Sequence, residues 1–205
     1  MSSRESILAA VKANQPDSTA LPDLSLFGTT EQGSLQKFAE VLGAIGGKIF
    51  HVSSYDEIAQ TISLQYGDGV KIVSPLKEFK ELRTENLDDL TSIHDLHDVD
   101  VAILKAHFGV AENGAVWITE NEMVHRVLPF VTQHLAIVID AKAIVPTMHQ
   151  AYDKISNAVY GFGAFIAGPS KTADIEQSLV IGAHGPRSMA VFVLNDNPYS
   201  AEAIK

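Results

Sequence analysis

The chain has 205 residues, of which 46% are hydrophobic and 20% are charged, and its formal net charge is −10 at pH 7. This length suits one domain or one domain with an appendage, and no apolar run approaches the roughly 18 residues that span a bilayer. An acidic chain repels the phosphate backbone of a nucleic acid. The composition therefore predicts a globular protein with neither a membrane nor a nucleic acid as partner.

The sequence contains no cysteine. Disulfides, thiolate nucleophiles, zinc–thiolate sites and iron–sulfur clusters ligated by this chain are thereby excluded. No metal-binding motif such as HExxH is present, so we predict no metal site and no cofactor bound by cysteine. Residues 1–15 lack the pattern of a signal peptide, which predicts a cytoplasmic location.

The N-terminal segment carries a helix signal. Ser2 and Glu5 have the spacing of a capping box, which predicts a short amphipathic helix over residues 2–13. Its apolar face needs a partner. Residues 14–32 are polar and contain proline and glycine, so we expect an irregular arm that packs on a neighbouring subunit of a homo-oligomer. The predicted organisation is an N-terminal helix and arm at 1–33 and a main domain at 34–205.

Helical and extended patterns alternate after residue 34. Apolar residues recur at helical spacing until Gly46 and Gly47 end the first helix. Strands are predicted over 48–52, 69–73, 115–119, 134–139, 164–167 and 189–194, and helices over 55–66 and 147–158. The polar segment 76–100 is predicted to be a helix with surface loops. This alternation indicates an α/β fold with a mainly parallel sheet.

A loop-forming stretch from Gly168 to Arg187 gathers hydroxyl, carboxylate, imidazole and guanidinium groups between two apolar runs. Ligand-binding groups concentrate on loops that a rigid scaffold carries, so the stretch predicts a ligand site. Ser170 and Thr172 precede a plausible helix start, whose free N–H groups and hydroxyls would bind an anion. Their ordinary role would be to cap that helix.

Two arginines and one histidine are further candidates. Arg126 and Arg187 offer planar donor forks that suit a carboxylate or phosphate. Alternatively, either arginine pairs with Asp174 or Glu176 and braces the loops. His184 lies in a glycine-rich loop, where an imidazole either transfers protons or makes a structural hydrogen bond.

A second motif, Glu112-Asn113-Gly114, reads as a turn before a strand. A carboxylate at such a turn can act as a base, a nucleophile or a hydrogen-bond acceptor. A solvated turn glutamate is the equally plausible alternative.

The ordered motifs GVAENGAVWIT, HRVLP, AIVP, GPSKTADIE and GAHGPR together resemble the LUD domain family of lactate-utilisation proteins, which includes LutC- and YkgG-like members. The resemblance runs from about residue 34 to the end. It implies a three-layer α/β/α fold similar to the NagB/RpiA/CoA-transferase-like group. It also implies a role in oxidation of L-lactate to pyruvate beside iron–sulfur subunits. Family members usually carry threonine where this chain has Asn113 and Ala115.

We therefore expect an accessory protein of L-lactate utilisation that binds a small organic or phosphorylated anion. The alternative is an independent enzyme, similar to a CoA-transferase or a sugar-phosphate isomerase, in which Glu112 reacts; that role reaches Glu112 by fold analogy only. The predicted site residues, expected to converge at the carboxyl ends of strands, are Glu112 and His184 as catalytic groups, and Asn113, Gly114, Arg126, Gly168, Ser170, Thr172, Asp174, Glu176, Gly185 and Arg187 as ligand-binding groups.

Overall fold

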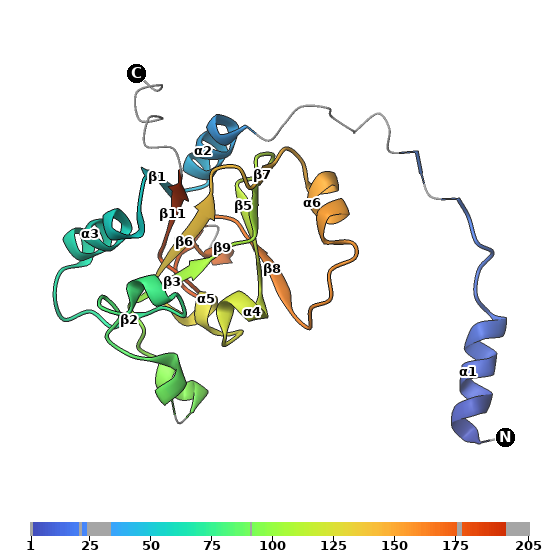
Figure 1. Ribbon diagram of the computed structural model, residues 1–205. Helices are drawn as coiled ribbons and strands as arrows, with labels where there is room; N and C mark the ends of the chain where they lie inside the picture. The colour runs from blue at the N-terminus through green and yellow to red at the C-terminus, as the bar shows by residue number, and fades with distance from the viewer. Residues whose placement is uncertain (1, 21, 24–33, 91, 176–177, 196–205) are drawn as a thin grey trace.

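The computed structural model describes residues 2–20, 22–23, 34–90, 92–175 and 178–195. It contains two main sheets with helices around them (Figure 1). None of the described helices has the length and apolar character needed to cross a membrane. The α/β fold with a mainly parallel central sheet is confirmed, and a second sheet packed against it is an addition that the sequence did not reveal.

The central sheet, sheet A, is parallel throughout and has the strand order β1-β11-β6-β3-β2. Successive side chains along each strand point to opposite faces of the sheet, and both faces are apolar. Both faces are buried, which explains why these strands read as nearly continuous apolar runs. Its strands are β1 (Lys48–Val52), β2 (Ile72–Val73), β3 (Val101–Lys105), β6 (His134–Asp140) and β11 (Ser188–Leu194).

Helix α3 (Tyr55–Tyr66) covers one face of sheet A (Figure 1). Ser54 caps this helix by accepting a hydrogen bond from the Glu57 amide at 3.2 Å. Ile58 and Ile62 project from α3 into the apolar cluster formed by the odd-numbered residues of β3 and the even-numbered residues of β6 and β11. The predicted helix 55–66 is thus confirmed, and its apolar stripe is what holds it on the sheet.

The other face of sheet A packs against helix α2 (Leu35–Ala44), two one-turn helices and sheet B. Sheet B has the order β7-β4-β5-β8, and β5 is antiparallel to both of its neighbours. Helix α6 (Met148–Ile155) covers the far face of sheet B. The remaining elements of this half are β4 (Phe108–Val110), β5 (Ala115–Thr119), α4 (Glu120–Met123), α5 (Leu128–Val131), β7 (Ile144–Val145) and β8 (Gly163–Ile166).

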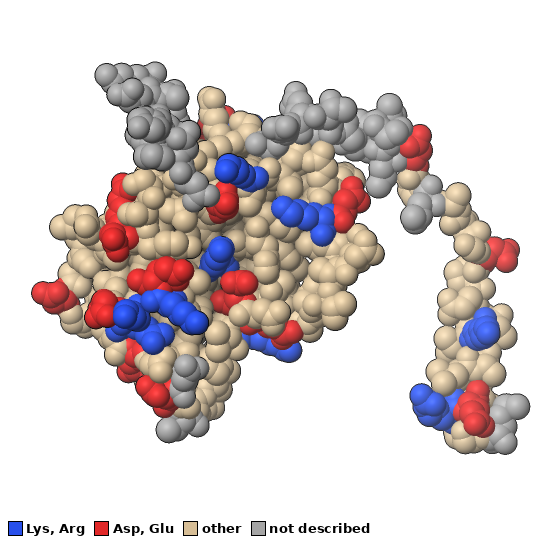
Figure 2. Space-filling model, viewed as in Figure 1, with Lys and Arg blue, Asp and Glu red and all other residues tan. Residues whose placement is uncertain are grey.

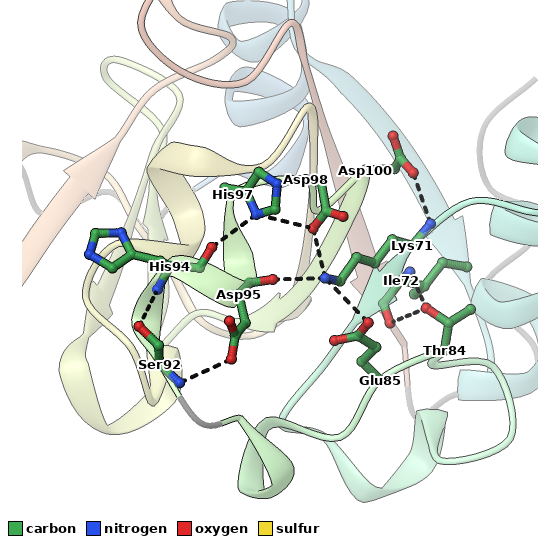
Figure 3. Close-up of polar contacts among 10 residues, drawn as sticks. All are labelled: Lys71, Ile72, Thr84, Glu85, Ser92, His94, Asp95, His97, Asp98 and Asp100. Atoms are coloured by element: carbon green, nitrogen blue, oxygen red, sulfur yellow. Dashed lines mark hydrogen bonds and ion pairs between the residues drawn. The ribbon is translucent and has the colours of Figure 1, made fainter.

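The segment 76–100, predicted to be a helix with surface loops, forms three short 3₁₀ helices among its described residues, Lys77–Phe79, Leu87–Asp89 and Ile93–Leu96. Lys71 ties this segment to the sheet (Figure 3). Its ammonium lies 2.7 Å from Asp98 Oδ1 and 3.2 Å from Glu85 Oε1, and donates to the Asp95 carbonyl at 2.7 Å. The hydrogen bond with Asp98 is the main cause that raises the pKa of Lys71 and lowers the pKa of Asp98. Charge pairing therefore replaces helical hydrogen bonding here.

Helix α1 (Ser3–Ala13) has the predicted capping box between Ser2 and Glu5. None of its residues is buried, and the apolar side chains Ile7, Leu8 and Val11 are exposed. The neighbouring subunit expected to cover them remains a prediction. Much of the arm that follows, including residues 24–33, lies outside the described residues.

The approach of α2 to sheet B depends on Gly109 and gives a testable prediction. A Cβ at Gly109 would lie 2.9 Å from Ile144 Cδ1 and 3.0 Å from Phe38 Cε2. We expect Gly109→Ala to lower the free energy of unfolding by about 1–3 kcal/mol, because the added methyl group would overpack a core that is already filled. Gly43 on the exposed side of α2 is the matched control, since a Cβ there meets nothing within 4 Å.

Gly43→Ala should raise the free energy of unfolding by up to about 1 kcal/mol, because alanine loses less backbone freedom in a helix. Urea unfolding followed by circular dichroism measures both variants. Equal effects of the two substitutions would contradict the packing described here.

Candidate functional site

The predicted site residues lie in separate places. The Glu112 turn follows β4, and Arg126 follows β5 and α4 along the chain. The remaining candidates belong to the segment from Gly168 to Arg187. Glu112 and Arg126 are at opposite ends of β5, whose five residues span roughly 16 Å. The expectation that all of them converge at the carboxyl ends of strands is wrong, since Arg187 precedes β11 and lies at its amino end.

The Glu112 turn is built by local hydrogen bonds. The Glu112 carboxylate is exposed, and its Oε2 accepts a hydrogen bond from the amide of Met148, the first residue of α6, at 2.7 Å. A carboxylate is favourable at a helix N-terminus, where the amides are unpaired. Asn113 Oδ1 accepts from the Ala115 amide at 3.0 Å, which closes the turn. Both side chains thus have structural partners.

Arg126 is engaged in an ion pair. Its Nε donates to Glu120 Oε2 at 2.7 Å, and the guanidinium carbon lies 5.7 Å from the centre of the Phe162 ring. The other oxygen of Glu120 accepts from the Gly161 amide at 2.7 Å. The hydrogen bond from the Gly161 amide is the main cause that lowers the pKa of Glu120, and the hydrogen bond from Arg126 is the second. The guanidinium therefore braces the loop that leads into β8, through Glu120 rather than through the partners expected from sequence.

Ser170 and Thr172 do not begin a helix, which corrects the sequence prediction. Strand β9 (Lys171–Ile175) pairs antiparallel with β10 (Ser178–Ile181), so Thr172 and Asp174 lie on a β-hairpin. The β-branched residues in both strands favour this pairing over a helix. Glu176 lies outside the described residues.

The ends of this hairpin meet the chain between α5 and β6, at a place we call the hairpin junction. Ser170 donates its amide to the Pro186 carbonyl at 2.8 Å, and Gly182 donates to the Ser170 carbonyl at 2.9 Å. Arg187 donates its amide to the Gln133 carbonyl at 2.8 Å. Three backbone hydrogen bonds therefore fix the junction without using the side chains of Ser170 and Arg187.

Two glycines among the predicted site residues allow segments of the chain to approach each other closely around the junction. Gly185 faces Ser170, where a Cβ would lie 3.0 Å from the serine Cβ. Gly168 has a φ of +71°, and a Cβ there would lie 3.0 Å from the Ile45 carbonyl oxygen. Their role is thus backbone packing, which brings the loops together.

The cations of the junction differ from Lys71 and Arg126 in their partners. On the face drawn in Figure 2, basic and acidic side chains are interspersed. Lys71 and Arg126 each have a carboxylate partner. Arg187 and Lys171 are exposed, and neither has an ion pair with any side chain that the structure describes. His184 is also exposed in this loop. The junction therefore offers two cations and the Ser170 hydroxyl to an anion.

A polar trio that sequence reasoning missed adjoins Arg187. His134 and Ser188 begin the neighbouring strands β6 and β11, and their Nδ1 and Oγ atoms lie 2.8 Å apart. Tyr66, at the end of α3, hydrogen-bonds Ser188, and its ring centre lies 4.7 Å from that of His134. The available signal in the sequence was a polar residue at the start of each of these two apolar runs. Only the pairing of β6 with β11 makes the two residues neighbours.

Burial and nearby charge shape the titration of this trio. Burial lowers the pKa of His134, the positive charge of Arg187 lowers it further, and Asp100 opposes the change. Burial likewise raises the pKa of Tyr66. A neutral imidazole beside a hydroxyl can accept a proton, so the trio supplies acid–base groups next to the cationic Arg187.

Comparisons with known proteins agree with the fold. The model of the LUD domain family matches residues 35–194. The chain is 32% identical to Lactate utilization protein C from Bacillus pumilus over 102 residues, which are 47% of this chain and 42% of that protein. For Lactate utilization protein C from Geobacillus kaustophilus the identity is 29% over 155 residues, or 64% of this chain and 65% of that protein. The matched segments span between 42% and 65% of the length of these curated relatives.

One relative matches nearly end to end. An uncharacterized protein from Neisseria meningitidis is 24% identical over 221 residues, which cover 95% of this chain and 94% of that protein. Among solved structures, a DUF162 family protein from Deinococcus radiodurans superposes with a TM-score of 0.60 at 18% identity, covering 78% of this chain and 95% of that one. The latter likeness concerns the fold.

The lowered pKa of His134 predicts a pH dependence of stability. The unfolded histidine has a pKa of about 6.5. Between the folded and the unfolded pKa, the unfolded chain binds the proton more readily, so stability rises with pH through that window. We expect His134→Asn to flatten the rise in the urea midpoint between pH 5 and pH 7. His184→Asn removes an exposed imidazole and is the control. The same flattening in both variants would contradict the assignment.

Proposed function

Because this chain belongs to the LUD domain family, we propose that it takes part in L-lactate utilisation as a cytoplasmic protein. In this proposal it binds a small organic or phosphorylated anion and acts with iron–sulfur subunits that oxidise lactate to pyruvate. The family match over residues 35–194 carries the proposal, together with relatives named Lactate utilization protein C.

The hairpin junction is the proposed anion site. Arg187 supplies a guanidinium without a carboxylate partner among the described side chains, and Lys171 supplies a second cation. A guanidinium binds a carboxylate or phosphate through two parallel hydrogen bonds. The Ser170 hydroxyl supplies a further donor at the junction, where Gly185 lets the two loops approach closely. These features favour a compact anion.

The division of labour follows from composition. These 205 residues contain no cysteine and thus no thiolate for an iron–sulfur cluster. Electron transfer is therefore assigned to partner subunits, and this chain is assigned binding and positioning. The alternative enzyme that uses Glu112 gains no support from the contacts of that carboxylate, which caps α6.

Loss of Arg187 should weaken anion binding. We expect Arg187→Ala to lower the affinity for the bound anion by several-fold to about 100-fold, corresponding to about 1–3 kcal/mol, because a bidentate charged contact is lost. Calorimetric titration with lactate, pyruvate, acyl-CoA and sugar phosphates identifies the anion and measures the change. Arg4→Ala on α1 removes the same charge far from the junction in sequence and should leave the affinity unchanged. Equal affinities of Arg187→Ala and the parent would disprove the site.

The isolated chain should not oxidise lactate. Lactate-dependent reduction of a dye is expected only after reconstitution with iron–sulfur partner subunits, since the chain has no cluster ligands among cysteines. The assay compares the chain alone, the partner subunits alone and the mixture. Steady dye reduction by the chain alone, freed of metal and flavin, would overturn the proposed division of labour.

A further inference from the structure

A pocket of about 270 Å³ lies at sheet B, beside helix α6, and contains none of the predicted site residues. Strands β4 and β5, the end of α6 and the connection from α6 to β8 form its walls. Its volume is just below the range of roughly 300–1,000 Å³ that is typical of ligand pockets. The occupant must therefore be a small molecule, of about one ring.

The pocket has a fixed aromatic wall. Trp117 is only 6% exposed, and its ring centre lies 4.6 Å from that of Phe165 and 5.4 Å from that of Tyr160. Gly163 allows this arrangement, because a Cβ at that position would lie 2.4 Å from the indole. Phe108 forms a further part of the lining. Aromatic groups pack favourably against such a lining, so the pocket is suited to a flat ligand.

The polar side of the pocket is cationic. Lys154 Nζ lies 4.8 Å from the centre of the Phe108 ring, and it has no ion pair with any described carboxylate. No acidic residue lines the pocket, although the chain as a whole carries a formal charge of −10. An exposed cation–π contact is weak and does not neutralise the ammonium. The exposed ammonium is therefore available to an anionic group of a ligand.

Three further polar side chains complete the lining. His107 Nε2 and Thr119 Oγ1 lie 2.8 Å apart, so each orients the other. Asn121 adds an amide that both donates and accepts hydrogen bonds. A few placed polar groups within an otherwise apolar lining are the usual composition of a small-molecule site.

We propose that this pocket binds a small planar carboxylate, with its ring or conjugated chain against Trp117 and its carboxylate on Lys154. The site is separate from the hairpin junction, and its ligand class differs from the compact anion proposed there. The two sites are therefore tested by different substitutions.

Trp117 makes the test direct, since it is the one tryptophan of the chain. Benzoate, the probe, should change the indole fluorescence in a saturable manner below about 10 mM and should shift the single indole N–H resonance in an NMR spectrum. Benzyl alcohol has the ring without the charge, and acetate has the charge without the ring. Both should bind at least about tenfold more weakly than benzoate, since each lacks one of the two contacts.

Lys154→Met tests the charge while it keeps an unbranched side chain over Phe108. We expect it to weaken benzoate binding about tenfold or more, by loss of the charged contact. Lys142→Met removes an exposed lysine that does not line the pocket and should bind benzoate like the parent. Arg187→Ala should also bind benzoate like the parent, even if it loses the anion of the junction.

Three results would overturn the proposal. One is the absence of a saturable change at Trp117 with benzoate. Another is a Lys154→Met variant that folds like the parent, as judged by its thermal unfolding, and binds benzoate with the parental affinity. Loss of benzoate binding in Arg187→Ala would place the probe at the hairpin junction and would likewise reject the pocket.

Discussion

Helix α2 approaches the backbone of its surroundings more closely than side chains would permit, and glycines make this possible. Phe38 lies against Gly109, and a Cβ at Gly114 would come within 3.0 Å of the Leu42 backbone. Gly168 meets the Ile45 carbonyl at the end of the same helix. One helix thus fixes the separation of the two sheets, the turn that carries Glu112 and the start of the loop that leads to the junction. The Glu112 turn and the start of the loop that leads to the junction therefore depend on this packing.

Whether a cation is structural or available follows from its partners. Lys71 is held by Asp98 and Glu85, and Arg126 by Glu120, so moving either charge to a ligand would break an existing pair. Arg187 and Lys154 have no such partner among the described side chains. Most of the other described lysines and arginines also have no ion pair with a described side chain, so this property makes a cation available but does not by itself mark a site. What distinguishes Arg187 and Lys154 is their place, at the hairpin junction and in the lining of the pocket.

The elements with a clear period and a cap could be predicted from sequence. Helix α3 combined a capping serine with buried Ile58 and Ile62, and β6 and β11 were long apolar runs. The β9–β10 hairpin was missed because Ser170 and Thr172 fit a helix cap as well as a strand end, and only pairing across the hairpin decides between them.

The arrangement of the site was harder to predict than its residues. Glu112 and Arg126 are separated by few residues, but an extended strand between them places them apart. Conversely, Tyr66, His134 and Ser188 are far apart in sequence, and the parallel pairing of β6 with β11 makes two of them neighbours. The lining of the pocket has the same property, because His107, Thr119 and Lys154 come from three different elements. Contacts across strands carry no local pattern, so single-sequence reasoning had no means of assembling them.

The structure explains the two residues of the Glu112 turn, Asn113 and Ala115, that differ from the usual sequence of the family. Asn113 replaces a residue with a hydroxyl, and its Oδ1 accepts from the Ala115 amide, which is a contact that a threonine hydroxyl also makes in turns. Ala115 is 1% exposed and faces the core rather than solvent. A hydroxyl at that position would have to find a buried partner. The Asn113 side chain therefore closes this turn, and Ala115 fills a buried position without a hydroxyl that would need a partner.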